Sequence, residues 1–252
     1  MSKMRLLLSV VLIGFVLAGC AGQSERDGVD TAKAAQFNAE LGLRYMVQGK
    51  DELAMEKLQR ALEFNPDLAI AHHYMAELYR RLGKKGEADT HYRRAMELAP
   101  NDSTIKNNYG IFLCGEKRYD EGEKYVLQAL DDPVYTERAQ GYENLGHCMH
   151  DKGDMTKAEK YFRRALQYNP RLPGSLQAMA EISLNEKNYI SARAFLQRYE
   201  AVAPHTAESL WLGIQIERVL GNKDALSSYA LSLKNNFPDS PQTQLYLNSQ
   251  HP

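Results

Sequence analysis

AQFNAELGLRYMVQGKDELAMEKLQRALEFNPDL, at residues 35–68, is followed directly by AIAHHYMAELYRRLGKKGEADTHYRRAMELAPND, at residues 69–102. The two stretches have the same length, and they share small residues and a closing proline at matching positions. The matching pairs are Gly42 and Ala76, Ala54 and Ala88, Ala61 and Ala95, and Pro66 and Pro100. A period of about 34 residues with this pattern is typical of a helix–turn–helix repeat. A single unit cannot bury its apolar face alone, so we expect several units to stack.

Prolines mark the ends of further repeats, because proline cannot continue a helix and shifts the residue before it away from helical geometry. They lie 34, 70, 34 and 34 residues apart, at Pro66, Pro100, Pro170, Pro204 and Pro238. The interval of 70 holds two repeats and two extra residues, which we place between Asp131 and Arg138.

The pattern predicts an all-α protein, a single right-handed superhelical solenoid of six tetratricopeptide repeats. The solenoid is expected to occupy residues 33–252, with a cap at 241–252. The predicted repeats are 35–68, 69–102, 103–136, 139–172, 173–206 and 207–240.

Residue size predicts the packing seam inside each repeat. Position 8 is small in most units, which allows the two helices of a pair to approach closely. Position 24 carries larger side chains that can fill the seam, at Leu58, Tyr92, Val126, Phe162 and Leu196. The pattern loosens in the unit at 207–240, as expected of a terminal repeat.

The amino terminus has the features of an export signal. Lys3 and Arg5 precede an uncharged apolar run at 6–17. A run of this length is too short to cross a bilayer as a helix, and it is typical of a secretory signal. We therefore predict a signal peptide at 1–19 that is removed.

The sequence LAGC, at residues 17–20, resembles a bacterial lipobox, in which the cysteine is lipidated and becomes the new amino terminus. We predict lipidation of Cys20 and a flexible tether at 20–32, where the residues are small and polar. Ala21, in place of an aspartate that would signal inner-membrane retention, indicates a protein anchored by lipid at the periplasmic face of the outer membrane. The alternative is an ordinary signal peptide with a chance cysteine.

Composition and motifs exclude several functional classes. The chain has 31 Lys and Arg against 32 Asp and Glu, and loss of residues 1–19 removes two of the basic residues. A slightly acidic mature chain gives no sign of a nucleic-acid partner. The sequence has no phosphate-binding glycine loop, His-Glu-x-x-His motif, Cys-x-x-Cys pair or serine elbow. We therefore predict no enzyme, no cofactor and no small-molecule substrate.

His147 and His150 lie three residues apart on one expected helix, close to Asp151. This spacing can place two metal ligands on one face of a helix, and an enzyme would need its site here. The alternative is a row of polar residues on a concave surface. Because the sequence offers no evident third ligand, we predict no metal.

Cys114 and Cys148 are expected on the first helices of adjacent repeats, which pack side by side in a solenoid. An exported protein meets an oxidising periplasm, where a disulfide can form. Two small buried thiols are the alternative.

A concave groove lined by the first helices is the expected working surface. The first repeat places apolar residues where solvated polar ones would be expected, and we predict that this stripe binds a helix or strand of a protein partner. The predicted binding residues are Ala39, Leu43, Met46, Val47 and Ile70. The alternative is that the stripe packs against its own second repeat or under the tether.

Two stretches go beyond the generic repeat pattern. The first is NNYGIFLC at 107–114, followed by RYDEGEKY at 118–125. The second is DPVY at 132–135, followed by ENLGHC at 143–148. With the lipobox and six repeats, they resemble the type IV pilus biogenesis and stability lipoproteins, the pilotin family, over nearly the whole mature chain.

The resemblance implies an outer-membrane lipoprotein without catalytic activity that helps the pilus secretin reach the membrane and form its ring. It implies two partners, a secretin subunit and outer-membrane lipid bound through acylated Cys20. It also implies that Cys114 and Cys148 pair. A lipoprotein adaptor for murein hydrolases or for outer-membrane protein assembly is the competing interpretation, and the proteins that co-purify would distinguish the two.

Overall fold

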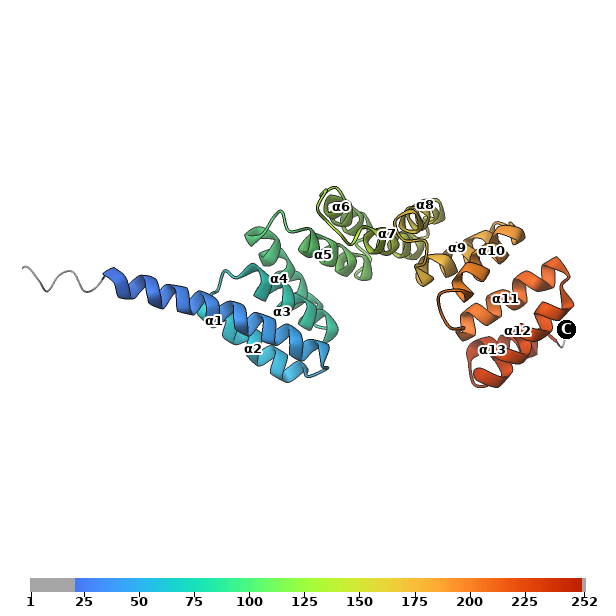
Figure 1. The fold of residues 1–252 in the computed structure, drawn as a ribbon, viewed down its shortest axis with the longest axis horizontal. Coiled ribbons are helices and arrows are strands. Elements are labelled where there is room, and N and C mark those ends of the chain that lie inside the picture. The colour runs from blue at the N-terminus through green and yellow to red at the C-terminus, as the bar shows by residue number, and fades with distance from the viewer. Residues whose placement is uncertain (1–20, 251–252) are drawn as a thin grey trace, which may run out of the picture. The chain divides into compact units, whose positions relative to one another are not determined.

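The computed structural model describes residues 21–250, which form thirteen helices and no strand (Figure 1). The predicted signal peptide and Cys20 lie outside the described residues. The helices are α1 (Ala21–Val47), α2 (Asp51–Phe64), α3 (Ala69–Arg81), α4 (Lys85–Leu98), α5 (Ser103–Gly115), α6 (Tyr119–Leu130), α7 (Arg138–Lys152), α8 (Met155–Tyr168), α9 (Pro173–Asn185), α10 (Tyr189–Glu200), α11 (Ala207–Leu220), α12 (Lys223–Asn236) and α13 (Pro241–Asn248).

Each predicted repeat is one pair of these helices, beginning with α1 and α2 and ending with α11 and α12. The turn inside every pair contains one residue in the left-handed region of backbone geometry. These residues are Gly49, Gly83, Lys117, Gly153, Lys187 and Gly221. Glycine adopts this geometry without a steric penalty, whereas the two lysines adopt it at some cost.

The two-residue insertion lies where the sequence predicts it, in the connection between Leu130 and Arg138. The Arg138 guanidinium donates hydrogen bonds to the carbonyl oxygens of Leu130, at 2.7 Å, and of Asp132. Tyr135 in the middle of the connection is buried. The longer connection is therefore packed and hydrogen-bonded.

Close approach of the two helices in a pair depends on a small residue facing a large one. A Cβ built on Gly42 would lie 2.6 Å from the Leu58 side chain, and one on Gly146 would lie 2.5 Å from the Phe162 ring. The predicted seam residues at position 24 are all 1% exposed or less. The helix pairs therefore interlock as the size pattern predicts.

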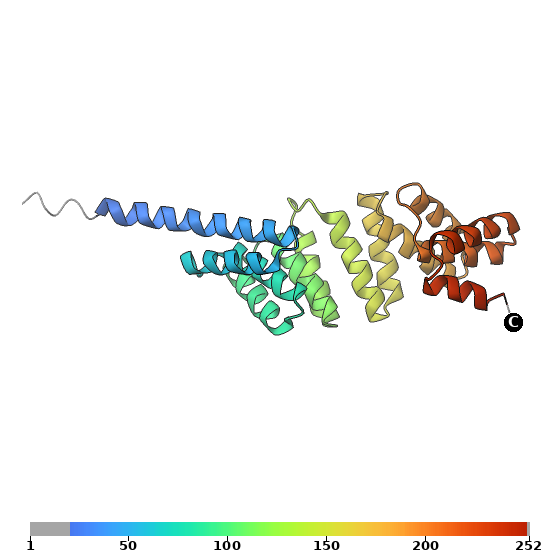
Figure 2. The same cartoon turned by 90° about the horizontal axis from the view of Figure 1, so that it is seen from below.

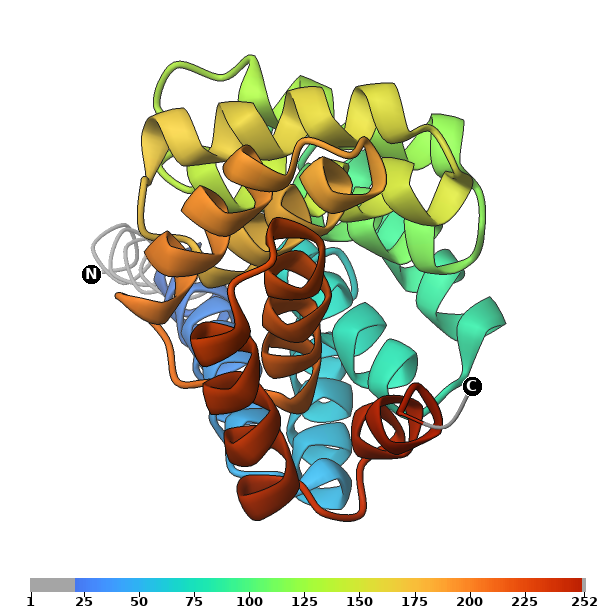
Figure 3. The same ribbon diagram turned by 90° about the vertical axis from the view of Figure 1, so that its right-hand side faces the viewer.

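Contacts divide the described residues into two compact units, which meet between Ile105 and Lys106, where the sequence predicts one continuous solenoid. A helix pair in such an array contacts only its neighbours, so few contacts hold the array together across any one seam. In the first unit, α1 packs on α2 and α3 (Figure 2). In the second unit, α13, the deepest red helix of Figure 3, packs on α11 and α12.

The prediction of a flexible tether at 20–32 is wrong for residues 21–32, which form the first part of α1. Packing of the later turns of α1 on α2 already supplies the costly helix nucleus. Extending the helix backwards then meets no proline, and the strongest local penalties come from Gly22 and Gly28, at about 1 kcal/mol each.

Candidate protein-binding surfaces

The predicted apolar stripe of the first repeat is not a continuous exposed surface. Met46 is 8% exposed and lies in a hydrophobic cluster with Leu58, Met75 and Leu78. Its carbonyl oxygen accepts a hydrogen bond of 2.6 Å from Arg81. The prediction of exposure is therefore wrong for Met46, because the second repeat covers it.

Ala39 is also fully buried, in a cluster with Ala61 and Ala71, and Ile70 packs partly buried against the same cluster. The prediction of exposure is wrong for Ala39 for the same reason. A methyl group at this position allows α1 to approach α3, with which it is in contact.

The other residues of the stripe differ in exposure. Val47 is 81% exposed at the end of α1, whereas Leu43 is intermediate. Phe37 is 61% exposed. Only part of the predicted stripe is therefore available to a partner.

The first unit has a recess of about 460 Å³ that includes Ile70 from the predicted set. Its lining comes from α1, from the start of α3 and from the chain around Asp102. The lining residues are Gln36, Leu68, Ala69, Ile70, His73, Tyr74, Asp102, Thr104 and Ile105. The opening is partly apolar, and its volume falls within the range of about 300–1,000 Å³ that is usual for ligand pockets.

Two titratable side chains of this recess are perturbed by burial. Burial lowers the pKa of His73, which is 5% exposed, so its imidazole stays neutral even though Glu77 and Asp102 oppose the shift. Burial also raises the pKa of Tyr74, and the negative charges of Glu40 and Asp102 act in the same direction. The recess therefore offers the uncharged polar groups of His73 and Tyr74 and the carboxylate of Asp102 beside apolar walls. Tyr74 lies at repeat position 6, outside the positions from which the sequence pattern predicts a groove.

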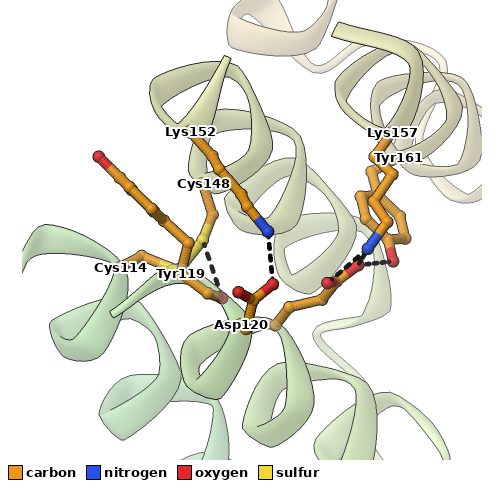
Figure 4. The surroundings of a disulfide bond; sticks show 8 residues. Cys114, Tyr119, Asp120, Cys148, Lys152, Lys157 and Tyr161 are labelled. Atoms are coloured by element: carbon orange, nitrogen blue, oxygen red, sulfur yellow. Dashed lines mark hydrogen bonds and ion pairs between the residues drawn. A yellow bond between two sulfur atoms is a disulfide. The ribbon is translucent and has the colours of Figure 1, made fainter. Parts of the chain in front are cut away.

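In the second unit, a disulfide joins Cys114 at the end of α5 to Cys148 on α7, with Cα atoms 5.5 Å apart (Figure 4). Lys152 of α7 forms an ion pair with Asp120 of α6 beside the disulfide (Figure 4). The third and fourth repeats are thus held together by one covalent bond and by a charge pair.

The same figure shows Lys157 and Tyr161 of α8 pointing toward one acceptor. That acceptor is the buried carboxylate of Glu123, which accepts from Lys157 at 2.8 and 2.9 Å and from the Tyr161 hydroxyl at 2.6 Å. Burial, with the carboxylate partner, raises the pKa of Tyr161 well above its ordinary value.

The second unit has a recess of its own, of about 790 Å³, which lies among α6, α7 and α8. Here Arg164 lies over the rings of Tyr142 and Tyr168, at 5.8 and 5.2 Å from the ring centroids. The two tyrosine rings stack on each other with centroids 5.6 Å apart. The groove positions of the sequence pattern do not include this layer, because Arg164 and Tyr168 are on the second helix of the repeat and Tyr142 is at position 4 of the first.

His147 and His150 are exposed on α7. His147 packs edge-on against Phe162, and its Nε2 lies 4.0 Å from Glu143. His150 lies 3.5 Å from Asp151. In the part of the chain that the structure describes, no group of three His, Cys, Asp or Glu side chains could hold a metal ion. In that same part, no helix is both long enough and apolar enough to span a membrane.

Comparison with known proteins identifies the family to which this architecture belongs. A family model described as a tetratricopeptide repeat matches residues 69–203, and a TPR repeat model matches residues 42–83. The type IV pilus assembly protein PilF of Pseudomonas aeruginosa is 34% identical over 239 residues, which is 94% of each chain. The chain belongs to the tetratricopeptide repeat family and is a homologue of PilF.

Solved structures of tetratricopeptide relatives agree in fold. The structure of P. aeruginosa PilF superposes with a TM-score of 0.81 at 32% identity, covering 87% of this chain and 99% of that one. The structure of PilW, described as a widely conserved type IV pilus biogenesis factor, gives a TM-score of 0.77 at 30% identity, covering 84% and 98%. The predicted all-helical tetratricopeptide fold is therefore confirmed.

Proposed function

We propose that this tetratricopeptide homologue of PilF is a non-catalytic outer-membrane lipoprotein that acts as a pilotin for the type IV pilus secretin. It binds a secretin subunit, directs it to the outer membrane and promotes its assembly into a ring. The observation that carries the proposal is the similarity to a type IV pilus assembly protein over 94% of both chains. The lipobox that ends at Cys20 supports the membrane anchor.

The course of α1 supports a role for the first unit in holding the subunit. This helix begins at Ala21, one residue after the proposed lipid attachment, and reaches Gln36 of the recess fifteen residues later. At about 1.5 Å per residue, the recess lies roughly 23 Å along the helix from the anchor. A bound subunit is then kept close to the bilayer, where tethering raises its effective concentration for ring closure.

The anchor can be tested separately from the binding site. Cys20→Ser removes the acylation site and leaves the recess unchanged. We expect a strong loss of detergent-resistant secretin multimers from the outer-membrane fraction, measured by immunoblot, because stable anchoring needs acyl chains. Normal multimers in the outer membrane would refute the anchoring part of the proposal.

The binding site is tested with a photocrosslinking residue at Ile70, in the recess of the first unit, while Cys20 is intact. The matched control carries the same residue at Ile190, which is 67% exposed in the second unit. We expect crosslinks to the secretin from position 70 that greatly exceed those from position 190. Crosslinks to murein hydrolases or to outer-membrane assembly factors in place of the secretin would support the competing adaptor role.

A further inference from the structure

Three buried glutamates of the second unit have different partners. Glu123 accepts hydrogen bonds from Lys157 and Tyr161, and Glu217 accepts from both Nε and Nη2 of Arg193. Their residues are 8% and 4% exposed. In each case the cation comes from the second helix of a neighbouring repeat. Such a cation is expected, because a buried carboxylate is stable only when it is paired.

The third buried glutamate, Glu143 of α7, is 9% exposed and has no such cation among the described residues. One of its oxygens accepts a 2.9 Å hydrogen bond from the Ser175 hydroxyl. The other lies 4.0 Å from Nε2 of His147, beyond hydrogen-bond distance. An ionised carboxylate can accept about four hydrogen bonds, so one hydroxyl leaves most of its capacity unused.

The oxygen without a hydrogen bond lies beside a small pocket. A Cβ built on Gly174 would clash with this oxygen, and Gly174 and His147, its two neighbours, both line an opening of about 180 Å³ that Glu143 itself does not line. The full lining is His147, His150, Phe162, Gly174, Gln177, Ala178 and Glu181. The volume is below the roughly 300 Å³ at which small-molecule pockets begin, so it suits a single side chain.

Apart from the imidazoles of His147 and His150, the only ionisable side chain that lines the pocket in the described part of the chain is a carboxylate. Glu181 supplies a second carboxylate, which accepts from Gln177 at 3.0 Å, and no lysine or arginine is among the lining residues that the structure describes. Phe162 and Ala178 provide an apolar wall against which the methylene stem of a lysine can pack while its ammonium group reaches the carboxylates.

A local role for Glu143 accounts for part of this geometry. Gly174 and Ser175 are in the first turn of α9, where the helix dipole favours a negative charge. This explains the hydrogen bond from Ser175. It does not explain the second carboxylate, Glu181, more than one turn further along the helix.

We propose that this pocket binds the side chain of a lysine presented by a protein partner, with Glu143 and Glu181 as the acceptors of its ammonium group. Charge complementarity carries the assignment, because the partner's cation takes the place that Lys157 and Arg193 occupy at the other two buried glutamates. The site belongs to the second unit, whereas the recess assigned to the secretin belongs to the first, and the site stands whether or not that proposal holds.

The test uses Nα-acetyl-lysine N-methylamide as the probe and the norleucine analogue, which has the same stem without the ammonium group, as its control. Both are titrated into the ¹⁵N-labelled full chain and followed by amide chemical shifts. We expect shifts concentrated at His147, Gly174, Gln177 and Ala178, with a dissociation constant on the order of 1–10 mM for lysine. Norleucine should bind at least about tenfold more weakly, since a lost charge-assisted hydrogen bond is worth about 1.5–3 kcal/mol.

Two substitutions in the pocket and one outside it complete the test. Glu181→Gln and Glu143→Gln each remove one acceptor charge, and each should weaken lysine binding at least about fivefold. Glu186→Gln removes an exposed charge just after α9 and should leave binding unchanged. Glu181 is only partly buried, so its variant keeps the fold even if Glu143→Gln does not.

Equal binding of lysine and norleucine would overturn the proposal, as would wild-type affinity in Glu181→Gln. Shifts spread over acidic residues throughout the surface would show nonspecific attraction and would also overturn it. None of these measurements contains secretin, so their failure leaves the pilotin proposal untouched.

Discussion

The fourth repeat and the last repeat fill the same seam in opposite ways. In α7 and α8, Gly146 makes room for the ring of Phe162. At the matching positions of α11 and α12 the large residue is Ile214 and the small one is Ala230, and both are buried in one cluster. The helix pair therefore requires a combined volume across the seam, and it does not require a small residue on a particular helix.

The largest effect should come from breaking this interlock in the fourth repeat. Phe162→Ala leaves Gly146 facing a cavity, and we expect a loss of about 3–5 kcal/mol in the free energy of unfolding, measured by urea denaturation. Adding Gly146→Ile to Phe162→Ala recreates the arrangement of the last repeat and should recover at least about 1 kcal/mol. If the double variant were no more stable than Phe162→Ala, the seam of this repeat would require its small residue on the first helix and its large residue on the second.

The two repeats also differ in covalent support, because only the fourth is joined to its neighbour by a disulfide, Cys114–Cys148, among the described residues. The bond closes a loop with a sequence separation of 34, and the chain-entropy relation gives about 3–4 kcal/mol for its contribution. We expect the double variant Cys114→Ser, Cys148→Ser to lose up to this amount.

Amide hydrogen exchange locates that loss. Exchange should accelerate in α6 and α7 much more than in α11 and α12. Wild-type protein treated with dithiothreitol is the matched control and should behave like the double variant. Unchanged exchange in α7 would mean that packing alone holds the two repeats together.

A shared feature of the two repeats predicts a shared loss of stability at alkaline pH. Tyr161 and Tyr229 occupy the same repeat position, and each hydroxyl donates to a carboxylate, Glu123 at 2.6 Å and Glu200 at 2.5 Å. Burial raises the pKa of both tyrosines well above their ordinary value, with the carboxylate acting in the same direction. The unfolded chain therefore releases these protons first, near pH 10.

Stability from these groups is complete below about pH 10, and it falls at higher pH by up to about 1.4 kcal/mol per pH unit for each tyrosine. Tyr161→Phe and Tyr229→Phe should each flatten the decline measured by urea unfolding between about pH 9.5 and 11. Tyr168→Phe, at a 43% exposed position on α8, is the control and should keep the wild-type slope. A slope unchanged in all three variants would refute the assignment.

The sequence predicts the repeat limits well, because proline spacing and small residues reflect local geometry that neighbouring elements do not change. It predicts the exposure of the first repeat poorly. Ala39 and Met46 occupy groove positions by spacing, yet they are buried by residues of the second repeat. Spacing assigns a face of the helix, whereas exposure depends on how closely the next helix approaches.

Partners of buried charges are equally hard to predict from the sequence. Glu123 and Glu143 are both acidic residues on an expected helix, and only the structure shows that Lys157 reaches one of them while Ser175 reaches the other. The helical course of residues 21–32 was missed for a related reason. Composition describes a free segment, but this segment continues a helix that packing has already nucleated.

The smallest effect concerns the hairpin turns. The two compared repeats turn on Gly153 and Gly221, whereas the repeat between them turns on Lys187, with φ of 62°. A left-handed backbone costs an ordinary residue about 1–2 kcal/mol, and glycine avoids this at the expense of a more flexible unfolded chain. Lys187→Gly should therefore stabilise the protein by about 0.5–1 kcal/mol, measured by urea unfolding.

The reverse substitution, Gly153→Lys, should destabilise the protein by about the same amount or more. Both changes keep the backbone hydrogen bonds of the turn, which run from Lys187 N–H to the Leu184 carbonyl oxygen and from Gly153 N–H to that of His150. If Lys187→Gly were destabilising, the lysine side chain itself would have to contribute to the turn. The repeats would then differ in how they hold their hairpins as well as in how they fill their seams.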